Sequence, residues 1–138
     1  MTEKFELNQS YTYTFSFTQT DVIKYSEVTG DNNPIHLSKE FAAKTIFKKP
    51  ILHGLLSSSV FSKVLGTLFP GEGTIYLKQS LVFLKPMFVD TTYEAVLKVK
   101  KLYIEKHRAD IETNIKEVAS DNICITGEAY IMNTEVIN

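Results

Sequence analysis

Polar and apolar residues alternate strictly near the start of the chain. Every second position carries an aromatic side chain, and Thr or Ser fills the positions between them. Successive side chains of a strand point to opposite faces, so this period of two predicts a strand with one half-buried aromatic face. The aromatic positions are Tyr11, Tyr13, Phe15 and Phe17.

Two short helices are predicted next. Thr18 followed by Asp21 resembles a capping box, which predicts a helix that begins there and runs through about Val28. Ser38 can cap a second short helix in the segment KEFAAKTIF, residues 39–47, which fades before the following proline.

The longest helical pattern runs from His53 to Phe69. Its apolar residues recur at steps of three and four, as one face of a helix requires. Small residues occupy much of the opposite side, where a surface helix would carry charges, so we expect this helix to be enclosed by protein. The apolar positions are Leu55, Leu56, Val60, Val64, Leu65, Leu68 and Phe69, and the small ones are Ser57, Ser58, Ser59, Ser62 and Gly66.

Four segments rich in strand-forming residues follow Gly73, separated by short polar or proline-containing links. Such links favour antiparallel hairpins over parallel crossovers. Helices followed by a run of strands indicate an α+β fold, in which an antiparallel sheet wraps around one long central helix. We find no repeat or linker and expect a single domain over residues 1–138. The segments are TIYLKQSLVFLK, TTYEAVLKVKKLYI, ADIETNIKEVAS and NICITGEAYIMN.

Composition narrows the class of protein further. The formal net charge is −1 and no stretch gathers enough Lys or Arg for a nucleic-acid surface. Cys124 is the single cysteine, which excludes an internal disulfide, and no run approaches the ~18 apolar residues of a membrane span. We therefore expect a cytoplasmic protein. The three histidines, at positions 36, 53 and 107, lack the paired Cys/His spacing of a zinc site, so no metal is predicted.

The candidate chemistry lies in TGDNNPIH, residues 29–36. Gly30 is placed to end the first helix in a left-handed conformation, and Pro34 is expected to keep helix from resuming through the loop. Asp31 and His36 flank this stiffened turn and can converge on one water molecule, as general acid–base catalysis requires. The alternative is structural: Asp31 caps a turn and His36 is an ordinary hydrogen-bonded histidine.

A second candidate is Gly54, in the first turn of the long helix. Backbone N–H groups have no intrahelical partner there, and the helix dipole is positive. Glycine lets another molecule approach such an N–H closely, which suits a donor aimed at a carbonyl oxygen that gains negative charge. Glycine is also an ordinary residue at a helix start, so this feature alone is weak.

The sequence resembles a known family. The run from Tyr25 to His36, followed by Phe41-Ala42, is similar to the hydratase-2 signature of the MaoC-like (R)-specific enoyl-CoA hydratases, whose core is G-D-x-N-P-[LIV]-H. The similarity extends from about Tyr11 to Tyr130 and is greatest to the short hydratases linked to polyhydroxyalkanoate synthesis. Further matching segments are Pro50–Leu56, Phe61-Ser62, Pro70–Tyr76, Gln79–Leu81 and Phe83.

The resemblance implies a hot-dog fold and an acyl-CoA substrate bound near the interface of a homodimer, or of a dimer of dimers. It assigns Asp31 and His36 as the catalytic pair, Gly54 as the backbone donor to the thioester carbonyl, and Ser62 as a supporting residue. The implied reaction is reversible hydration of a trans-2-enoyl-CoA to an (R)-3-hydroxyacyl-CoA. It requires no metal or other cofactor, since CoA is part of the substrate.

Two other functions remain open at this stage. The same residues serve a dehydratase that acts on acyl carrier protein, and the fold also suits a non-catalytic acyl-CoA-binding module. A binding module has no need of both Asp31 and His36. Candidates for the acyl tunnel are Leu56, Val60, Leu81 and Phe83. Candidates for the CoA phosphates, each also readable as a solvated turn, are Lys48, Lys49, Lys106, His107 and Arg108.

Overall fold

A computed structural model describes residues 4–138 of the chain. In chain order, one strand comes first, four helices follow it, and the remaining strands come after the helices. The elements in chain order are β1 (Ser10–Phe15), α1 (Gln19–Thr29), α2 (Pro34–Leu37), α3 (Lys39–Ala43), α4 (Gly54–Thr67), β2 (Ile75–Gln79), β3 (Val82–Phe83), β4 (Tyr93–Tyr103), the 3₁₀ turn η1 (Ile104–Lys106), β5 (Arg108–Glu117) and β6 (Ile123–Met132).

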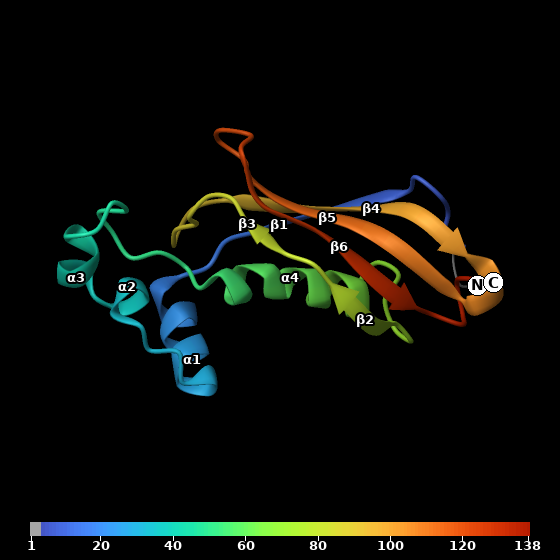
Figure 1. The fold of residues 1–138 in the computed structure, drawn as a ribbon, viewed down its shortest axis with the longest axis horizontal. Helices are drawn as coiled ribbons and strands as arrows, with labels where there is room; N and C mark the ends of the chain where they lie inside the picture. Colours follow the sequence, from blue (N-terminus) through green and yellow to red (C-terminus); the bar gives the residue numbers. More distant parts are fainter. Residues whose placement is uncertain (1–3) are drawn as a thin grey trace.

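The strands form one antiparallel sheet in the order β1-β4-β5-β6-β2, and β3 also pairs with β6. The helix α4 lies along one face of this curved sheet (Figure 1). The predicted α+β class, with an antiparallel sheet and one long helix, is therefore confirmed. The segment 74–85, predicted as one strand, is divided into β2 and β3, and the pairing of β2 with β6 shifts register between Tyr76 and Lys78.

The core lies between α4 and the sheet. The strands β4 and β5 alternate buried and half-buried residues, so every second side chain faces the helix. Burying one such Val, Leu, Ile or Phe side chain contributes roughly 1.5–3 kcal/mol, and this contact holds the two layers together. The buried residues of α4 and of these two strands include Leu56, Val60, Phe61, Val64, Leu65, Tyr93, Leu97, Val99, Ile111 and Ile115.

The capping prediction for α1 is confirmed. The N–H of Asp21 donates to Oγ1 of Thr18 (3.2 Å), and the N–H of Thr18 donates to Oδ2 of Asp21 (2.8 Å). Gly30 ends the helix in the left-handed region, with φ at 79°. The prediction for Pro34 was wrong, because Pro34 begins the one-turn helix α2. Proline has no N–H, but the N–H of the first helical residue has no partner within the helix. The φ of proline also fits a helix already.

The expectation that α4 is enclosed by protein holds for one side only. The sheet covers most of the apolar side. Of the small residues, Ser57 and Ser58 are buried while Ser59, Ser62 and Gly66 are exposed, and Leu55 in the first turn is 61 % exposed. A single six-stranded sheet can cover only one face of a helix. The exposed positions of α4 are Leu55, Ser59, Ser62, Lys63, Gly66 and Thr67.

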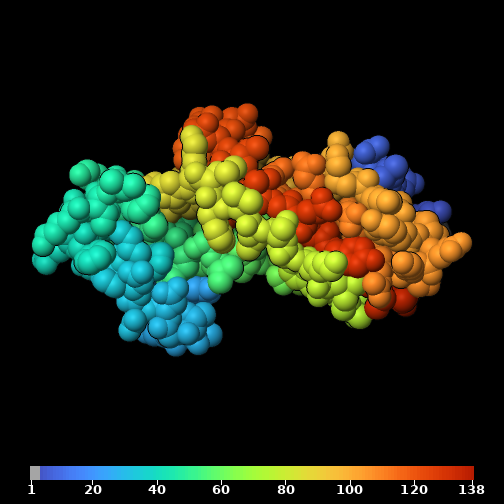
Figure 2. Space-filling view, in the orientation of Figure 1, coloured from blue at the N-terminus to red at the C-terminus, as the bar shows by residue number. Residues whose placement is uncertain are grey.

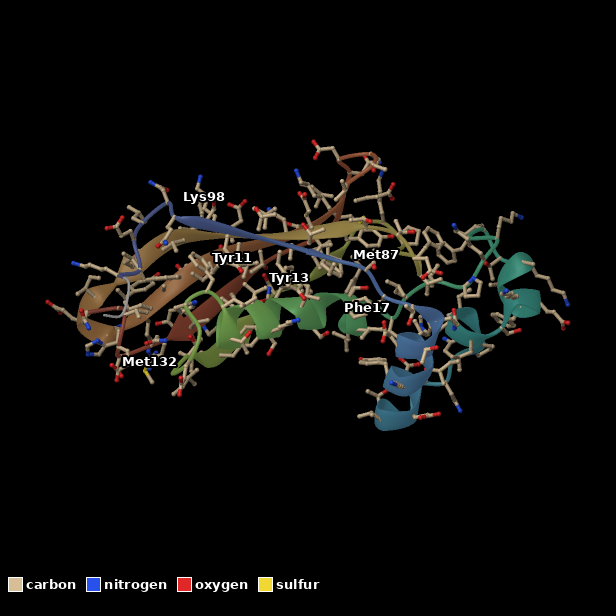
Figure 3. All side chains as sticks on the ribbon, turned by 180° about the vertical axis from the view of Figure 1, so that it is seen from behind. Tyr11, Tyr13, Phe17, Met87, Lys98 and Met132 are labelled. Atoms are coloured by element: carbon tan, nitrogen blue, oxygen red, sulfur yellow. The ribbon has the colours of Figure 1, made fainter. Side chains whose placement is uncertain are left out.

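The short helices α1, α2 and α3 gather beyond the N-terminal end of α4, away from the main body of the sheet (Figure 1). Seen from behind, Phe17 and Met87 lie where the sheet meets these helices, and Tyr11 and Tyr13 lie along β1 (Figure 3). The N–H of Leu52 donates to the carbonyl of Met87 (2.8 Å), which ties the chain entering α4 to the loop after β3. Among residues 4–138, no helix has both the length and the hydropathy that a membrane crossing needs.

Candidate functional site

The turn between α1 and α2 orients the candidate pair. Gly30 directs the chain out of α1, and its N–H donates to the carbonyl of Ser26 (2.8 Å). Asn33 caps α2, since its Oδ1 accepts from the N–H of Ile35 (3.2 Å). His36 then lies in the single turn of α2, and Asp31 lies at the start of the loop. The polar residues of TGDNNPIH thus build the turn that carries both side chains.

His36 is half-buried and held at one edge of its ring. Its Nδ1 lies 2.7 Å from the carbonyl oxygen of Ile51. A carbonyl can only accept, so Nδ1 carries the proton and Nε2 is left for other partners. Burial lowers the pKa of His36, an effect that the charge of His53 strengthens and that the Ile51 hydrogen bond and Asp31 oppose. The neutral ring is therefore favoured, with a free lone pair on Nε2.

Asp31, His36 and His53 come together. One donor or acceptor atom from each side chain lies within 4.8 Å of the corresponding atoms of the other two. Two groups that each hydrogen-bond one water molecule at about 2.8 Å are roughly 4.5 Å apart when the water is tetrahedral. Asp31 and His36 are therefore close enough for one water molecule to bridge them.

The same three side chains are a poor fit for a metal ion. The rings of His36 and His53 are stacked, with centroids 3.8 Å apart and planes 28° apart. Imidazole lone pairs lie in the plane of the ring, so two nearly parallel rings do not converge on one ion at the ~2.0–2.1 Å of a zinc–nitrogen bond. This geometry favours a water-binding site over a metal centre.

Gly54 is the first residue of α4, and its N–H has no intrahelical acceptor. Its backbone is outside the left-handed region, so the glycine is not required by φ. What glycine provides is space: a Cβ at this position would lie 2.5 Å from Cε1 of Phe83. Glycine therefore permits the close approach of a flat group to the start of the helix.

A cleft of about 460 Å³ opens at the start of α4 and joins these features. Its walls are largely apolar with a few polar side chains, of which Asp31, His36 and His53 lie together, as in many small-molecule sites. Ser57, one turn into α4, is buried and lines the cleft, and its Oγ has no hydrogen-bond partner among the described residues. The lining residues are Asp31, His36, Phe47, Ile51, Leu52, His53, Gly54, Leu55, Ser57, Phe83, Leu84, Lys85, Pro86, Met87 and Ile125.

The other predicted residues are more dispersed. Ser62 lies on the exposed side of α4 and is not among the residues lining the cleft. Of the tunnel candidates, Phe83 lines the cleft, Leu56 and Val60 are buried in the core, and Leu81 packs against the core.

The basic residues predicted as candidates for binding the CoA phosphates fall into two groups that lie apart in the structure. Lys106 and His107 lie in the tight connection between β4 and β5, as predicted, and Arg108 begins β5. All three lie at the end of the molecule away from α1, α2 and α3 (Figure 1). Lys48 and Lys49 lie in the connection between α3 and α4, and Nζ of Lys49 is 4.3 Å from the centre of the Phe88 ring. None of these residues lines the cleft, whereas Lys85, which the sequence did not suggest, does.

The sequence reasoning missed two further residues. His53 was set aside as a zinc ligand and given no other role, and Ser57 was interpreted as a small helix-packing residue. Both are buried and both line the cleft. The available signal was position, since His53 directly precedes Gly54 and Ser57 follows it by one helical turn.

An antiparallel sheet with one long helix on its face defines the class of hot-dog-fold proteins, and here an Asp/His pair lines the cleft at the start of that helix. The chain belongs to the family of proteins with a MaoC like domain, which matches residues 1–123.

Characterised relatives and solved structures agree with this assignment. The chain is 37% identical to the (R)-specific enoyl-CoA hydratase of Aeromonas caviae over 94% of its own length and 96% of the relative. It is 39% identical to the 3-hydroxybutyryl-CoA dehydratase of Methylorubrum extorquens over 81% of its length and 70% of the relative. The solved (R)-hydratase of A. caviae involved in PHA biosynthesis superposes with a TM-score of 0.90, covering 94% of this chain and 97% of that one.

Proposed function

We propose that this protein catalyses the reversible addition of water to a trans-2-enoyl-CoA, giving an (R)-3-hydroxyacyl-CoA. The observation that carries the proposal is the convergence of Asp31 and His36, within 4.8 Å of each other, near the free N–H at the start of α4. The hydratase of A. caviae, to which the chain is similar over nearly its whole length, is named for this activity.

The catalytic pair handles the water. Asp31, an exposed carboxylate, acts as the base that takes a proton from the water, while Nε2 of His36 holds the water in place. The water oxygen forms a bond to C3 of the enoyl group as the C2–C3 double bond opens. Asp31 then gives the proton that it took from the water to C2 on the same side, so the product gains one molecule of water and the pair returns to its starting state.

The N–H of Gly54 donates a hydrogen bond to the thioester carbonyl oxygen of the substrate. Attack at C3 moves negative charge onto the thioester oxygen, and a backbone N–H at the positive end of a helix stabilises that charge. Removing one such donor typically lowers kcat by about 10²- to 10³-fold. The proposed mechanism uses Asp31, His36 and Gly54 and draws on no cofactor, because CoA enters as part of the substrate.

The substrate lies in the cleft at the start of α4. Its apolar walls suit an acyl chain and the pantetheine arm of CoA, and the exposed Lys85 places a positive charge on the lining. We assign no role in substrate binding to the residues 106–108, because they lie at the far end of the molecule. Ser62 stays a prediction, since it lies outside the cleft of a single chain, and so does the cytoplasmic location.

A second copy of the chain is the partner that the surface suggests. The strand β2 ends the sheet order, so one side of it has unpaired backbone groups, which favour pairing with another strand. The segment 75–84 runs along the visible face beside β6 (Figure 2), and it carries exposed apolar side chains next to the exposed side of α4. A homodimer joined there would cover both. The exposed apolar residues are Ile75, Tyr76, Leu77, Val82, Phe83, Leu84 and, on α4, Leu55.

The experiment that tests the function follows the ultraviolet absorbance of the conjugated enoyl thioester in trans-2-enoyl-CoA. Hydration removes this absorbance without releasing free thiol, whereas a thioesterase releases thiol. The product should be refused by an (S)-specific 3-hydroxyacyl-CoA dehydrogenase. Binding of enoyl-CoA with no turnover would support the non-catalytic module, and turnover only of enoyl groups on acyl carrier protein would support the acyl-carrier-protein dehydratase.

A further inference from the structure

His53 occupies the N-cap position of α4 without acting as a cap. Its side chain makes no hydrogen bond to the first turn of the helix, although a capping side chain there would contribute ~1 kcal/mol. The ring is instead turned toward the loop before α2 and is only 2 % exposed. Stability of the helix start therefore does not explain a histidine at this position.

The imidazole is bound to the catalytic loop. Its Nε2 lies 3.0 Å from the backbone carbonyl oxygen of Asp31 and 3.2 Å from Oγ of Ser26. The carbonyl oxygen only accepts, so Nε2 of His53 must carry a proton and donate. This hydrogen bond joins the residue that precedes Gly54 to the backbone of the proposed base.

Two aromatic rings also pack against the imidazole of His53. The ring of His36 stacks on it at 3.8 Å, and the ring of Tyr25 lies 4.6 Å away at an angle of 56°. His36 is therefore held by its Nδ1 hydrogen bond to Ile51 at one edge and by His53 against its face. A ring fixed on two sides keeps Nε2 directed at one point.

The side chain of His53 thus contacts both members of the catalytic pair, and the backbone of His53 directly precedes Gly54. The geometry points to His53 as a positioning residue, which holds the Asp31 backbone and the His36 ring in register with the Gly54 N–H. The kinetic consequences of this inference rest on the proposed hydratase function, because His53 would act through Asp31 and His36. Reacting groups displaced by about 1 Å can lose a factor of ~10² in rate.

A matched pair of variants separates the N–H from the ring. His53→Phe keeps an aromatic ring for stacking but removes the donor, and His53→Gln keeps an N–H of similar reach without the ring. With trans-2-butenoyl-CoA (crotonyl-CoA) as substrate, we expect His53→Phe to lower kcat by ~10²-fold with KM changed only a few-fold. We expect His53→Gln to recover at least ~10-fold of that loss. Equal loss in the two variants, or wild-type kcat in His53→Phe, would overturn the inference.

A double mutant distinguishes positioning from general stability. In an Asp31→Ala background the group being positioned is absent, so adding His53→Phe should lower kcat little further. A structural role would instead multiply the two losses. Multiplicative losses would overturn the inference.

Two measurements do not depend on turnover and hold even if another reaction is the true one. Nitrogen-15 spectra of the wild-type protein should show His53 protonated at Nε2, and a bare Nε2 would overturn the inference. Amide hydrogen exchange of residues 30–36 should speed up by ~10-fold or more in His53→Phe and much less in His53→Gln, relative to amides of β5. Unchanged exchange in His53→Phe would overturn it. A wild-type protein with no activity on enoyl thioesters would refute only the proposed function.

Discussion

The ring of Phe83 lies over the backbone of Gly54, so closely that a Cβ at Gly54 would be 2.5 Å from Cε1 of the ring. Phe83 comes from the edge strand β3 and is 53 % exposed, so its ring has room to move aside. Any side chain at position 54 must displace the ring in this way. Alanine and proline at position 54 therefore share one steric effect and differ in the N–H.

Gly54→Pro should lower kcat by roughly 10²- to 10³-fold, because it removes the proposed donor to the thioester oxygen. Proline suits the first position of a helix, and the ψ of 132° at His53 is the extended conformation that a residue before proline prefers. Circular dichroism should show the fold retained. Gly54→Ala is the control, since it displaces Phe83 equally but keeps the N–H and should mainly raise KM. A folded Gly54→Pro enzyme with normal kcat would contradict the assignment of this donor.

Asp31→Ala and His36→Ala should each lower kcat by at least ~10²-fold with the fold retained. The double mutant should be little worse than the poorer single variant, because two groups that act on one water fail together. Asn32→Ala changes an exposed neighbour in the same loop and should leave kcat near the wild-type value. Full activity in either single variant would remove the proposed mechanism.

The stability of the protein should depend on pH through His36. Burial lowers the pKa of His36 from its ordinary 6.5, against the opposing effects of Ile51 and Asp31. The unfolded chain therefore takes up the proton first as pH falls. The contribution of the neutral ring to the free energy of unfolding is complete above pH 6.5 and is lost as pH falls through the lowered pKa.

Denaturant titrations at about pH 7.5 and about pH 5.5 test this dependence on either side of the ordinary histidine pKa. The excess stability of the wild type over His36→Gln should shrink at the lower pH. A gap that widens on acidification would show that the folded state favours the charged ring instead.

Ser57 gives a prediction that separates binding from stability. Its Oγ is buried in the cleft wall without a partner among the described residues, and a hydroxyl in this state destabilises the fold. Ser57→Ala should leave the free energy of unfolding unchanged or slightly higher, while KM rises roughly 2- to 10-fold if one ordinary hydrogen bond to the substrate is lost. Ser58→Ala is the matched control, because Oγ of Ser58 donates to the carbonyl of Leu55 (3.3 Å) and the residue does not line the cleft. Equal KM effects would remove Ser57 from the site.

Local features of the fold and site could be predicted from the sequence. The capping box at Thr18, the left-handed Gly30 and the turn that carries Asp31 and His36 depend on neighbours within a few residues, so short patterns report them. Pro34 was misjudged because a proline that ends one helix can equally begin another, and the sequence alone does not say which position it takes.

Features that depend on distant contacts were beyond the sequence patterns. The role of His53 depends on Ser26 and Asp31, which lie 27 and 22 residues earlier in the chain. The pairing of Ser10 with Lys98, which places β1 beside β4, leaves no local signal either. Ser57 and Ser58 look alike in the sequence, and only the rotation of α4 against the sheet decides that Ser57 lines the cleft and Ser58 does not.

Gly66 offers a test of the proposed homodimer that leaves the single chain unharmed. It lies on the exposed side of α4, and a Cβ there would have nothing within 4 Å. Replacing a helix-interior glycine with leucine favours the helix by up to about 1 kcal/mol, so Gly66→Leu should fold at least as well as the wild type. If a second copy covers this side, the larger side chain will obstruct it.

Light scattering should report twice 15.7 kDa, or a larger even multiple, for the wild type, and a shift toward 15.7 kDa for Gly66→Leu. Gly66→Ala, which gains helix propensity with only one methyl group, should stay assembled. A wild type that is active as a monomer, or a Gly66→Leu variant that assembles normally, would contradict an interface on this side of α4.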